Sequence, residues 1–144
     1  MRIAKALGIL ALVTGVFGAG CSGDGLGTQA SAAQWSPRAY GGESTIELGT
    51  VRPDGNAHWF KVWIVVIDDQ AYVRLGSRSA AKIAENRTTP YVGVRVAGQQ
   101  FDRVRAEPAP EMTERVAQAM AAKYWSDVVV HLIAHPLTLR LLPE

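Results

Sequence analysis

A short polar segment between two apolar runs carries the residue types that bind phosphate. Arg74 ends the first run, and a turn follows with four more hydrogen-bond donors, Ser77, Arg78, Ser79 and Lys82. A helix N-terminus adds free backbone N–H groups and a favourable dipole to such donors. A helix would place Arg78 and Lys82, four residues apart, on one face. The segment therefore predicts an anion site, although a basic turn is also typical of a solvated surface with occasional ion pairs.

Length and charge limit the classes of protein to consider. The chain has 144 residues, 48% of them hydrophobic, which suits one domain with its own core. A formal net charge of +2 does not indicate a nucleic-acid partner. No Ser-His-Asp arrangement, Walker loop or Gly-rich dinucleotide fingerprint is present. His131 and His135 are four residues apart without further His or Cys ligands nearby, so we expect neither a catalytic side chain nor a metal site.

The N-terminus has the pattern of an export signal. Basic residues at Arg2 and Lys5 precede an apolar run over residues 6–19 that is too short for a convincing membrane span. The small residues that lead into Cys21 resemble the lipobox of a bacterial lipoprotein, although Gly18 stands where an aliphatic residue is usual. We therefore predict a signal peptide over residues 1–20, a lipidated Cys21 and a place in the cell envelope, in the periplasm or at the cell surface. Ordinary export with cleavage near Ala32 and an uncleaved anchor are the alternatives.

A flexible linker is expected after the signal. Residues 22–36 contain few large apolar side chains that could offset the entropy of ordering the backbone. We assign residues 21–43 to this linker and residues 44–144 to the folded domain, which should begin between Trp35 and Ser44. The single cysteine excludes an internal disulfide.

The first part of the domain has the pattern of strands joined by tight turns. Residues 45–51 alternate, with Ile46, Leu48 and Thr50 on one face, and a Pro-Asp-Gly-Asn turn follows at 53–56. Residues 58–67 predict a central strand buried on both faces at its far end, and residues 70–75 predict the strand that returns. Such a meander favours an antiparallel sheet or barrel.

The second part mixes helices with strands. Ser77 or Ser79 can cap a helix over residues 80–85, and residues 91–96 and 99–106 read as strands around a turn at Gly98. In the second of these strands Phe101, Arg103 and Arg105 alternate with Asp102, Val104 and Ala106. A helix after Pro110 ends near Tyr124 and has an apolar stripe, Met112, Val116, Ala119, Met120 and Lys123. Residues 136–141 predict a last strand, and residues 126–135 fit either a short helix or an extended run.

This order of elements resembles a known fold. A β-β-β-α-β-β-α-β order is similar to the split β-barrel of the pyridoxamine-phosphate-oxidase-like flavoproteins and the deazaflavin-dependent nitroreductase-like proteins. The segments that carry the resemblance lie within residues 45–142, namely 63–69, 71–74, Ser77 and Arg78 with Lys82, and 86–96. The resemblance implies a six-stranded antiparallel split β-barrel with two helices, mainly β.

The resemblance also implies a cofactor and a partner. The equivalents of Arg74, Ser77, Arg78 and Lys82, with Ser79 at the same helix terminus, would hold the phosphate of FMN or of a deazaflavin. The ring system would lie against the strand around Lys61, Val62 and Trp63. Such barrels usually build this site between two subunits, which implies a homodimer. Electron transfer belongs to the cofactor, so no protein acid, base or nucleophile is needed.

Two functions follow from these patterns. One is a flavin- or deazaflavin-dependent oxidoreductase at the outer face of the membrane, supplied with electrons by a membrane partner because soluble nicotinamide donors are absent there. The other is a cofactor-free envelope lipoprotein of the same fold that serves as a binding or structural module. In either case Trp59 and Trp63 are more typical of a core or a dimer interface than of a ring-stacking platform.

Overall fold

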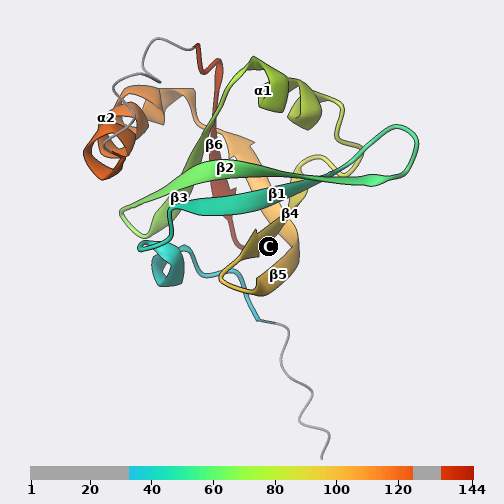
Figure 1. Ribbon diagram of the computed structural model, residues 1–144, viewed down its shortest axis with the longest axis horizontal. Coiled ribbons are helices and arrows are strands. Elements are labelled where there is room, and N and C mark those ends of the chain that lie inside the picture. Colours follow the sequence, from blue (N-terminus) through green and yellow to red (C-terminus); the bar gives the residue numbers. More distant parts are fainter. Residues whose placement is uncertain (1–32, 125–133) are drawn as a thin grey trace, which may run out of the picture.

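The computed structural model describes residues 33–124 and 134–144, and within them six antiparallel strands close a barrel (Figure 1). The strands are β1 (Thr45–Val51), β2 (Ala57–Ile67), β3 (Gln70–Leu75), β4 (Tyr91–Val96), β5 (Gln99–Pro108) and β6 (Leu137–Leu142). Their order around the barrel is β1-β2-β3-β6-β5-β4. The predicted six-stranded barrel with two helices is confirmed.

The β1–β2 hairpin forms as its residue pattern predicts. Ile46, Leu48 and Thr50 are buried, since alternate residues of a strand face the barrel interior. Gly55 has φ 85° in the connecting turn, a backbone conformation that glycine adopts without steric strain. The Arg52 N–H donates to the carbonyl of Asn56 across this turn at 2.9 Å. The far end of the hairpin projects beyond the barrel (Figure 1).

The predicted alternation of β5 is confirmed from Arg103 to Ala106 but is wrong at Phe101, because the strand contains an irregularity. Val94 lies opposite Phe101, whereas Val92 lies opposite Val104, so β5 has one more residue than β4 across this interval. Phe101 and Val104 are therefore both buried, although they are three residues apart. The extra residue turns Phe101 away from the face that it was expected to share with Arg103.

Helix α1 (Ser77–Ala84) covers part of the barrel core through Ala80 and Ile83. Neither predicted serine caps it, because the helix begins at Ser77 and the N-cap position is Gly76, which makes no side-chain capping bond. The helix therefore begins a few residues earlier than expected. In Figure 1, α1 lies above β2.

Helix α2 (Thr113–Lys123) follows the short 3-10 helix η2 (Pro110–Met112) and covers the outside of β2 and β3. Its predicted apolar stripe is confirmed, since Val116 and Met120 are buried against Val65 and Tyr72. Val65 faces this second cluster while Ile64 faces the barrel interior. The central strand is thus buried on both faces at its far end, as its sequence predicts.

Residues at the C-terminal end of α2 bind both the segment that leads into β1 and strand β2. The half-buried ammonium of Lys123 donates to the carbonyls of Gly41, Glu43 and Ile64. The Tyr124 hydroxyl lies 2.6 Å from the same Ile64 oxygen. Burial lowers the pKa of Lys123 and raises that of Tyr124, because both charged forms lose hydration.

Two aromatic residues of the predicted linker belong to the core. Trp35 and Tyr40 are buried with Phe101, and their ring centroids lie 5.3 to 6.0 Å apart. The Trp35 indole N–H donates to the carbonyl of Leu141 at 3.1 Å. The 3-10 helix η1 (Pro37–Tyr40) joins this cluster to β1. The packed part of the chain therefore includes residues before Ser44.

The predicted signal peptide, Cys21 and most of residues 126–135 lie outside the described residues. Among the residues that the structure describes, no helix is both long and apolar enough to cross a membrane.

Candidate functional site at the start of α1

The predicted basic residues lie on both sides of the turn from β3 into α1. Val73 and Leu75 face the core, so the side chain of Arg74 between them starts from the outer face of β3. Arg74 is half-buried, whereas Ser77 and Arg78 in the first turn of α1 are exposed. One arginine therefore stands near the end of β3 and the other in the first turn of α1.

These two arginines differ from the others in their bonding. Within the described chain, six arginines form ion pairs with carboxylates: Arg38, Arg95, Arg103, Arg105, Arg115 and Arg140. Arg52 and Arg87 hydrogen-bond to His58 and to the Pro53 carbonyl. The buried Nε of Arg74 has no partner among the described residues, and no bond or ion pair is found there for the Arg78 side chain. The alternative interpretation, a solvated surface with occasional ion pairs, therefore fits the other described arginines better than it fits Arg74 and Arg78.

The first turn of α1 adds backbone donors to the two cations. A helix leaves its first N–H groups without intrahelical acceptors, and here Gly76 has no side chain to accept from them. The positive end of the helix dipole lies at the same place. Among the described residues no hydrogen bond is found for the hydroxyls of Ser77 and Ser79, so they can also donate to a ligand. Together these groups can bind an anion with several negatively charged oxygens.

Lys82 lies one turn further along α1, in different surroundings. Its ammonium lies 4.6 Å from the centroid of the Phe60 ring, a cation–π contact. It also lines a cleft of about 270 Å³ with Thr50, Arg52, His58 and Glu85. Arg74, Ser77, Arg78 and Ser79 do not line this cleft. The structure thus separates Lys82 from the other predicted donors along the helix.

The two β2 residues predicted to meet the cofactor ring are covered by protein. Val62 is buried in the barrel core. The Trp63 ring stacks on Tyr124 with centroids 4.8 Å apart, which fits its alternative assignment to a packed cluster. The part of β2 that remains open to a ligand is its backbone. Its pairing with β3 ends at Ile64 and Val73, so from residue 57 to residue 63 the edge away from β1 has no partner strand among the described residues.

Sequence reasoning missed the setting of Trp59. The Trp59 ring lies across the cross-strand glycines Gly49 and Gly93, and the Arg95 guanidinium lies 3.7 Å from its centroid. Gly49 lies opposite Gly93 on one side and opposite Trp59 on the other. Once the strand register was known, this arrangement could have identified the setting of Trp59. Trp59 is half-buried on the outer face of the barrel, away from the core.

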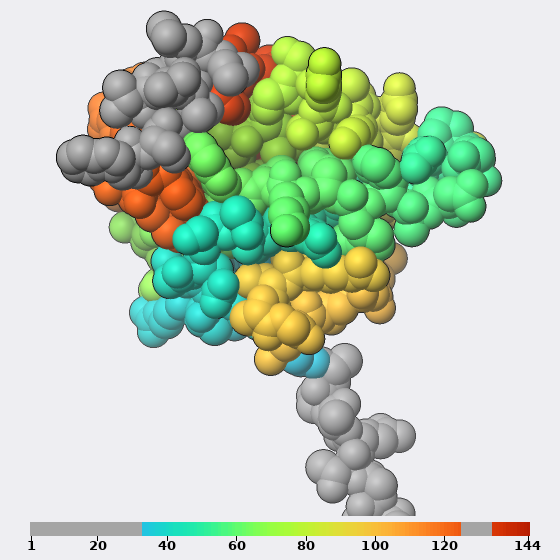
Figure 2. Space-filling view, viewed as in Figure 1, coloured from blue at the N-terminus to red at the C-terminus, as the bar shows by residue number. Residues whose placement is uncertain are grey.

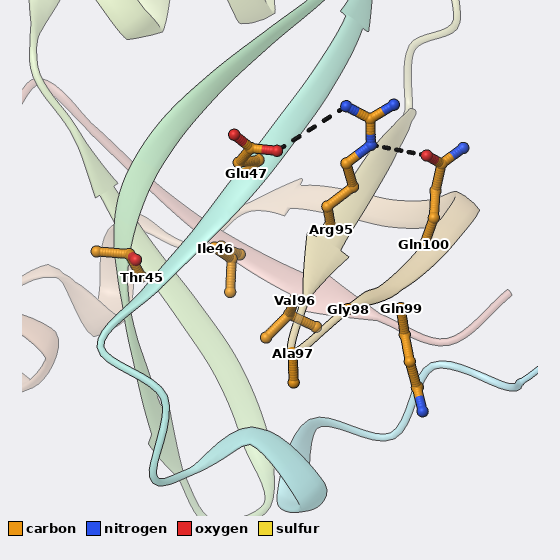
Figure 3. A pocket seen from close by; sticks show the side chains of 9 residues that line it. All are labelled: Thr45, Ile46, Glu47, Arg95, Val96, Ala97, Gly98, Gln99 and Gln100. Atoms are coloured by element: carbon orange, nitrogen blue, oxygen red, sulfur yellow. Dashed lines mark hydrogen bonds and ion pairs between the residues drawn. The ribbon is translucent and has the colours of Figure 1, made fainter.

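A second groove lies where β1 and β4 separate. Their pairing ends at Glu47 and Arg95, and a groove of about 380 Å³ opens between the strand ends. Figure 3 shows Arg95 between Glu47 and Gln100 at one end of it. The Arg95 Nε donates to the Gln100 side-chain oxygen at 2.7 Å, so its cationic group already has partners. None of the predicted site residues lines this groove.

Metal ligands do not gather elsewhere in the described part of the chain. Over residues 33–124 and 134–144, the His, Cys, Asp and Glu side chains form no group of three that could hold an ion. His131 lies outside these residues.

Comparison with known proteins identifies the class of fold. No protein-family model and no curated protein matches the chain. Among solved structures, it is similar to the heme storage protein HutZ from Vibrio cholerae, with 18% identity over 74% of this chain and 87% of that one and a TM-score of 0.51. It is also similar to an F420-H2 dependent reductase, FDR-A, with 9% identity over 69% and 94% and a TM-score of 0.51. A structure described as a domain-swapped dimer matches with 9% identity over 69% and 80% and a TM-score of 0.51.

These likenesses are to the fold. The chain shares a six-stranded barrel fold with these proteins. At such low identity a shared fold does not by itself assign a ligand or a reaction.

Proposed function

We propose that this chain is an oxidoreductase-like protein that binds the phosphate of FMN or of a deazaflavin at the N-terminal end of α1. The observation that carries the proposal is that, within the described residues, neither the buried Nε of Arg74 nor the Arg78 side chain has a hydrogen-bond or ion-pair partner, beside the first backbone N–H groups of α1. A buried guanidinium nitrogen without an acceptor is unfavourable, and a phosphate oxygen would satisfy it. The similarity to an F420-H2 dependent reductase supports the cofactor class.

The unpaired edge of β2 supports a place for the ring system. Lys61 lies within the unpaired stretch of β2, and the contact of Lys82 with Phe60 places α1 beside the same stretch. Backbone N–H and C=O groups on an unpaired edge need partners, and the polar rim of a flavin-type ring offers both donors and acceptors. In this proposal Val62 and Trp63 support the strand from behind, and its backbone contacts the ring.

A second subunit and an electron donor complete the proposal. One structural neighbour is a domain-swapped dimer, which supports a homodimer whose second copy would close the exposed side of the site. The predicted lipid on Cys21 would hold the dimer at the membrane, outside the cytoplasm. Electrons would then come from a membrane partner, because the cofactor carries out the transfer and must be reduced again.

A cofactor-free envelope module of the same fold is the second candidate. The covered side chains of Val62 and Trp63 favour it, since Val62 lies in the core and one face of the Trp63 ring is covered by Tyr124. In that case Arg74 and Arg78 would serve a different anion or none.

Titration with FMN and with an oxidised deazaflavin separates the two candidates. Each cofactor is added to the purified protein, and binding is followed through cofactor fluorescence. Arg74→Gln and Arg78→Gln should each weaken binding roughly 10- to 100-fold, because a bond between charged groups contributes about 1.5–3 kcal/mol. Arg115→Gln removes an arginine that pairs with Asp68 and should leave the affinity unchanged. If neither cofactor binds, or all three variants bind equally, the oxidoreductase proposal fails.

Membrane attachment is tested separately. Cells that express the full chain should carry it in the membrane fraction with a fatty-acyl label, whereas the Cys21→Ser variant should lose the label and leave that fraction. A labelled Cys21→Ser protein would refute lipidation at this cysteine.

A further inference from the structure

The cleft between the projecting hairpin and α1 carries chemistry that the proposed cofactor site does not use. Arg52 and His58 come from the β1–β2 hairpin, Lys82 comes from the C-terminal half of α1, and Glu85 is the C-cap residue of that helix. Figure 2 shows the hairpin projecting beyond the barrel next to the α1 region. The cleft measures about 270 Å³, room for a small ligand group.

The contact between Arg52 and His58 fixes the tautomer of the imidazole. The two side chains meet through the Arg52 guanidinium and Nδ1 of His58, 3.1 Å apart. A guanidinium only donates, so Nδ1 accepts and the ring proton of the neutral imidazole is on Nε2. Burial, followed by the positive charges of Lys82 and Arg52, lowers the pKa of His58, which favours the neutral ring. His58 therefore presents an Nε2–H donor.

That donor has no acceptor in the described chain. Nε2 of His58 is buried without a hydrogen-bond partner. A buried donor left unpaired is destabilising, and native proteins seldom keep one without a reason. The nearby Thr50 hydroxyl does not serve it, because that hydroxyl is directed to the main-chain carbonyl of His58 at 3.5 Å.

Neither cation at the cleft forms an ion pair with a carboxylate within the described residues, although the pKa of Asp54 is lowered first by hydrogen bonds and also by the charge of Arg52. Among the described residues, the contacts found for these side chains are that of Arg52 with the His58 ring and that of Lys82 with Phe60. Glu85 is exposed at the rim and forms no ion pair there. The cleft thus brings together two cations and one neutral N–H donor, with Glu85 as the one negative charge at its edge.

We propose that this cleft binds a small oxyanion, the carboxylate or phosphate group of a ligand, through Arg52, His58 and Lys82. A guanidinium, an ammonium and an imidazole N–H can all donate to such oxygens, and the charge-assisted bonds are the stronger ones. Glu85 opposes the ligand by repulsion and by competing for Lys82. The proposal goes beyond the cofactor site, because Arg74, Ser77, Arg78 and Ser79 do not line the cleft.

The first test uses inorganic phosphate and succinate on the full-length protein without a cofactor. The chain has three histidines, and loss of one imidazole signal in His58→Phe assigns the ¹⁵N resonances of His58. Before titration the spectrum should show the Nε2–H tautomer. At least one anion should shift the His58 signals saturably, and the tighter of the two identifies the preferred group. No saturable shift with either anion, or the same shift with sodium chloride at equal ionic strength, would overturn the proposal.

The second test uses variants that act in opposite directions, measured by calorimetric titration with the tighter anion. Arg52→Gln and His58→Phe should each weaken binding about tenfold or more, because each removes a donor. Glu85→Gln should tighten binding several-fold, which a loss of folding cannot imitate. Arg115→Gln, whose arginine pairs with Asp68, should bind like the unchanged protein. Equal affinities for Arg52→Gln and Arg115→Gln would refute the site. None of these readouts depends on a flavin, so failure here leaves the cofactor proposal standing, and the reverse also holds.

Discussion

Trp59 and the two glycines beneath it provide the sharpest stability test of the barrel. An alanine Cβ at position 93 would lie 2.6 Å from Cη2 of Trp59 and 3.2 Å from its Cζ3. Ordinary contacts between carbons lie at about 3.5–4.0 Å, so the ring would have to move by roughly 1 Å. The Arg95 guanidinium packs over the same ring at 3.7 Å and would be disturbed as well. Overpacking of this kind costs about 1–3 kcal/mol, which we expect for Gly93→Ala.

A double-mutant cycle attributes that cost to Trp59. In a Trp59→Val background no ring remains to be displaced, so Gly93→Ala should be neutral or stabilise by up to about 1 kcal/mol, the usual gain of alanine over glycine within a strand. Free energies of unfolding from urea titrations of all four proteins give the coupling energy.

Gly42 provides the control for the substitution at Gly93. Gly42→Ala adds a Cβ with no atom within 4 Å and should change stability by at most about 0.5 kcal/mol. If Gly93→Ala destabilises the Trp59→Val protein as much as the unchanged protein, the steric argument is wrong.

Three further predictions concern other parts of the chain. Asn86→Ala should lower the free energy of unfolding by about 2–3 kcal/mol in urea titrations, because the buried Asn86 side chain binds main-chain groups of β1 and β4. Tyr124→Phe should lower it by about 0.5–1.5 kcal/mol in the same assay, since the hydroxyl that fastens α2 to β2 is lost. The pKa of His58 is lowered from 6.5 by burial and then by Lys82 and Arg52, so the unfolded chain binds this proton more tightly. Stability should therefore fall as the pH drops below about 6.5, and less steeply in His58→Phe.

Features that depend on neighbouring residues along the chain were predictable. The alternation of Ile46, Leu48 and Thr50 placed β1 correctly, and the stripe through Val116 and Met120 identified the buried face of α2. Both signals depend on the fixed periods of strands and helices, which tertiary contacts leave intact here.

Features that depend on strand register or on distant partners were not predictable from the sequence. The extra residue of β5 cannot be read from one strand, because it exists only relative to β4. Trp35 stands in a Gly- and Ala-rich segment, and its burial depends on Phe101 and Leu141, far along the sequence. Gly76 became the N-cap although Ser77 and Ser79 are better capping residues, since the chain leaves β3 directly into the helix.

The residues of the candidate site show the same difference between local and long-range signals. Arg74, Ser77 and Arg78 follow one another closely, so the sequence could group them. Lys82 was added to that group by its helical spacing. In the structure it meets Arg52 and His58, which precede it by more than twenty residues. No local pattern connects a hairpin with a later helix.

The distribution of charge argues against a purely structural role for α1. Six arginines elsewhere in the described chain have carboxylate partners, which shows that the surface readily pairs its cations. Arg74 and Arg78 at one end of α1 and Lys82 near the other form no such pair within the described residues. A surface that keeps its cations unpaired along one helix forgoes a small stabilisation at each, and it keeps a positive potential that attracts anions. If α1 served only to cover the barrel, adding a carboxylate opposite Arg78 would be harmless to every ligand measurement, whereas the proposed phosphate site requires that change to weaken cofactor binding.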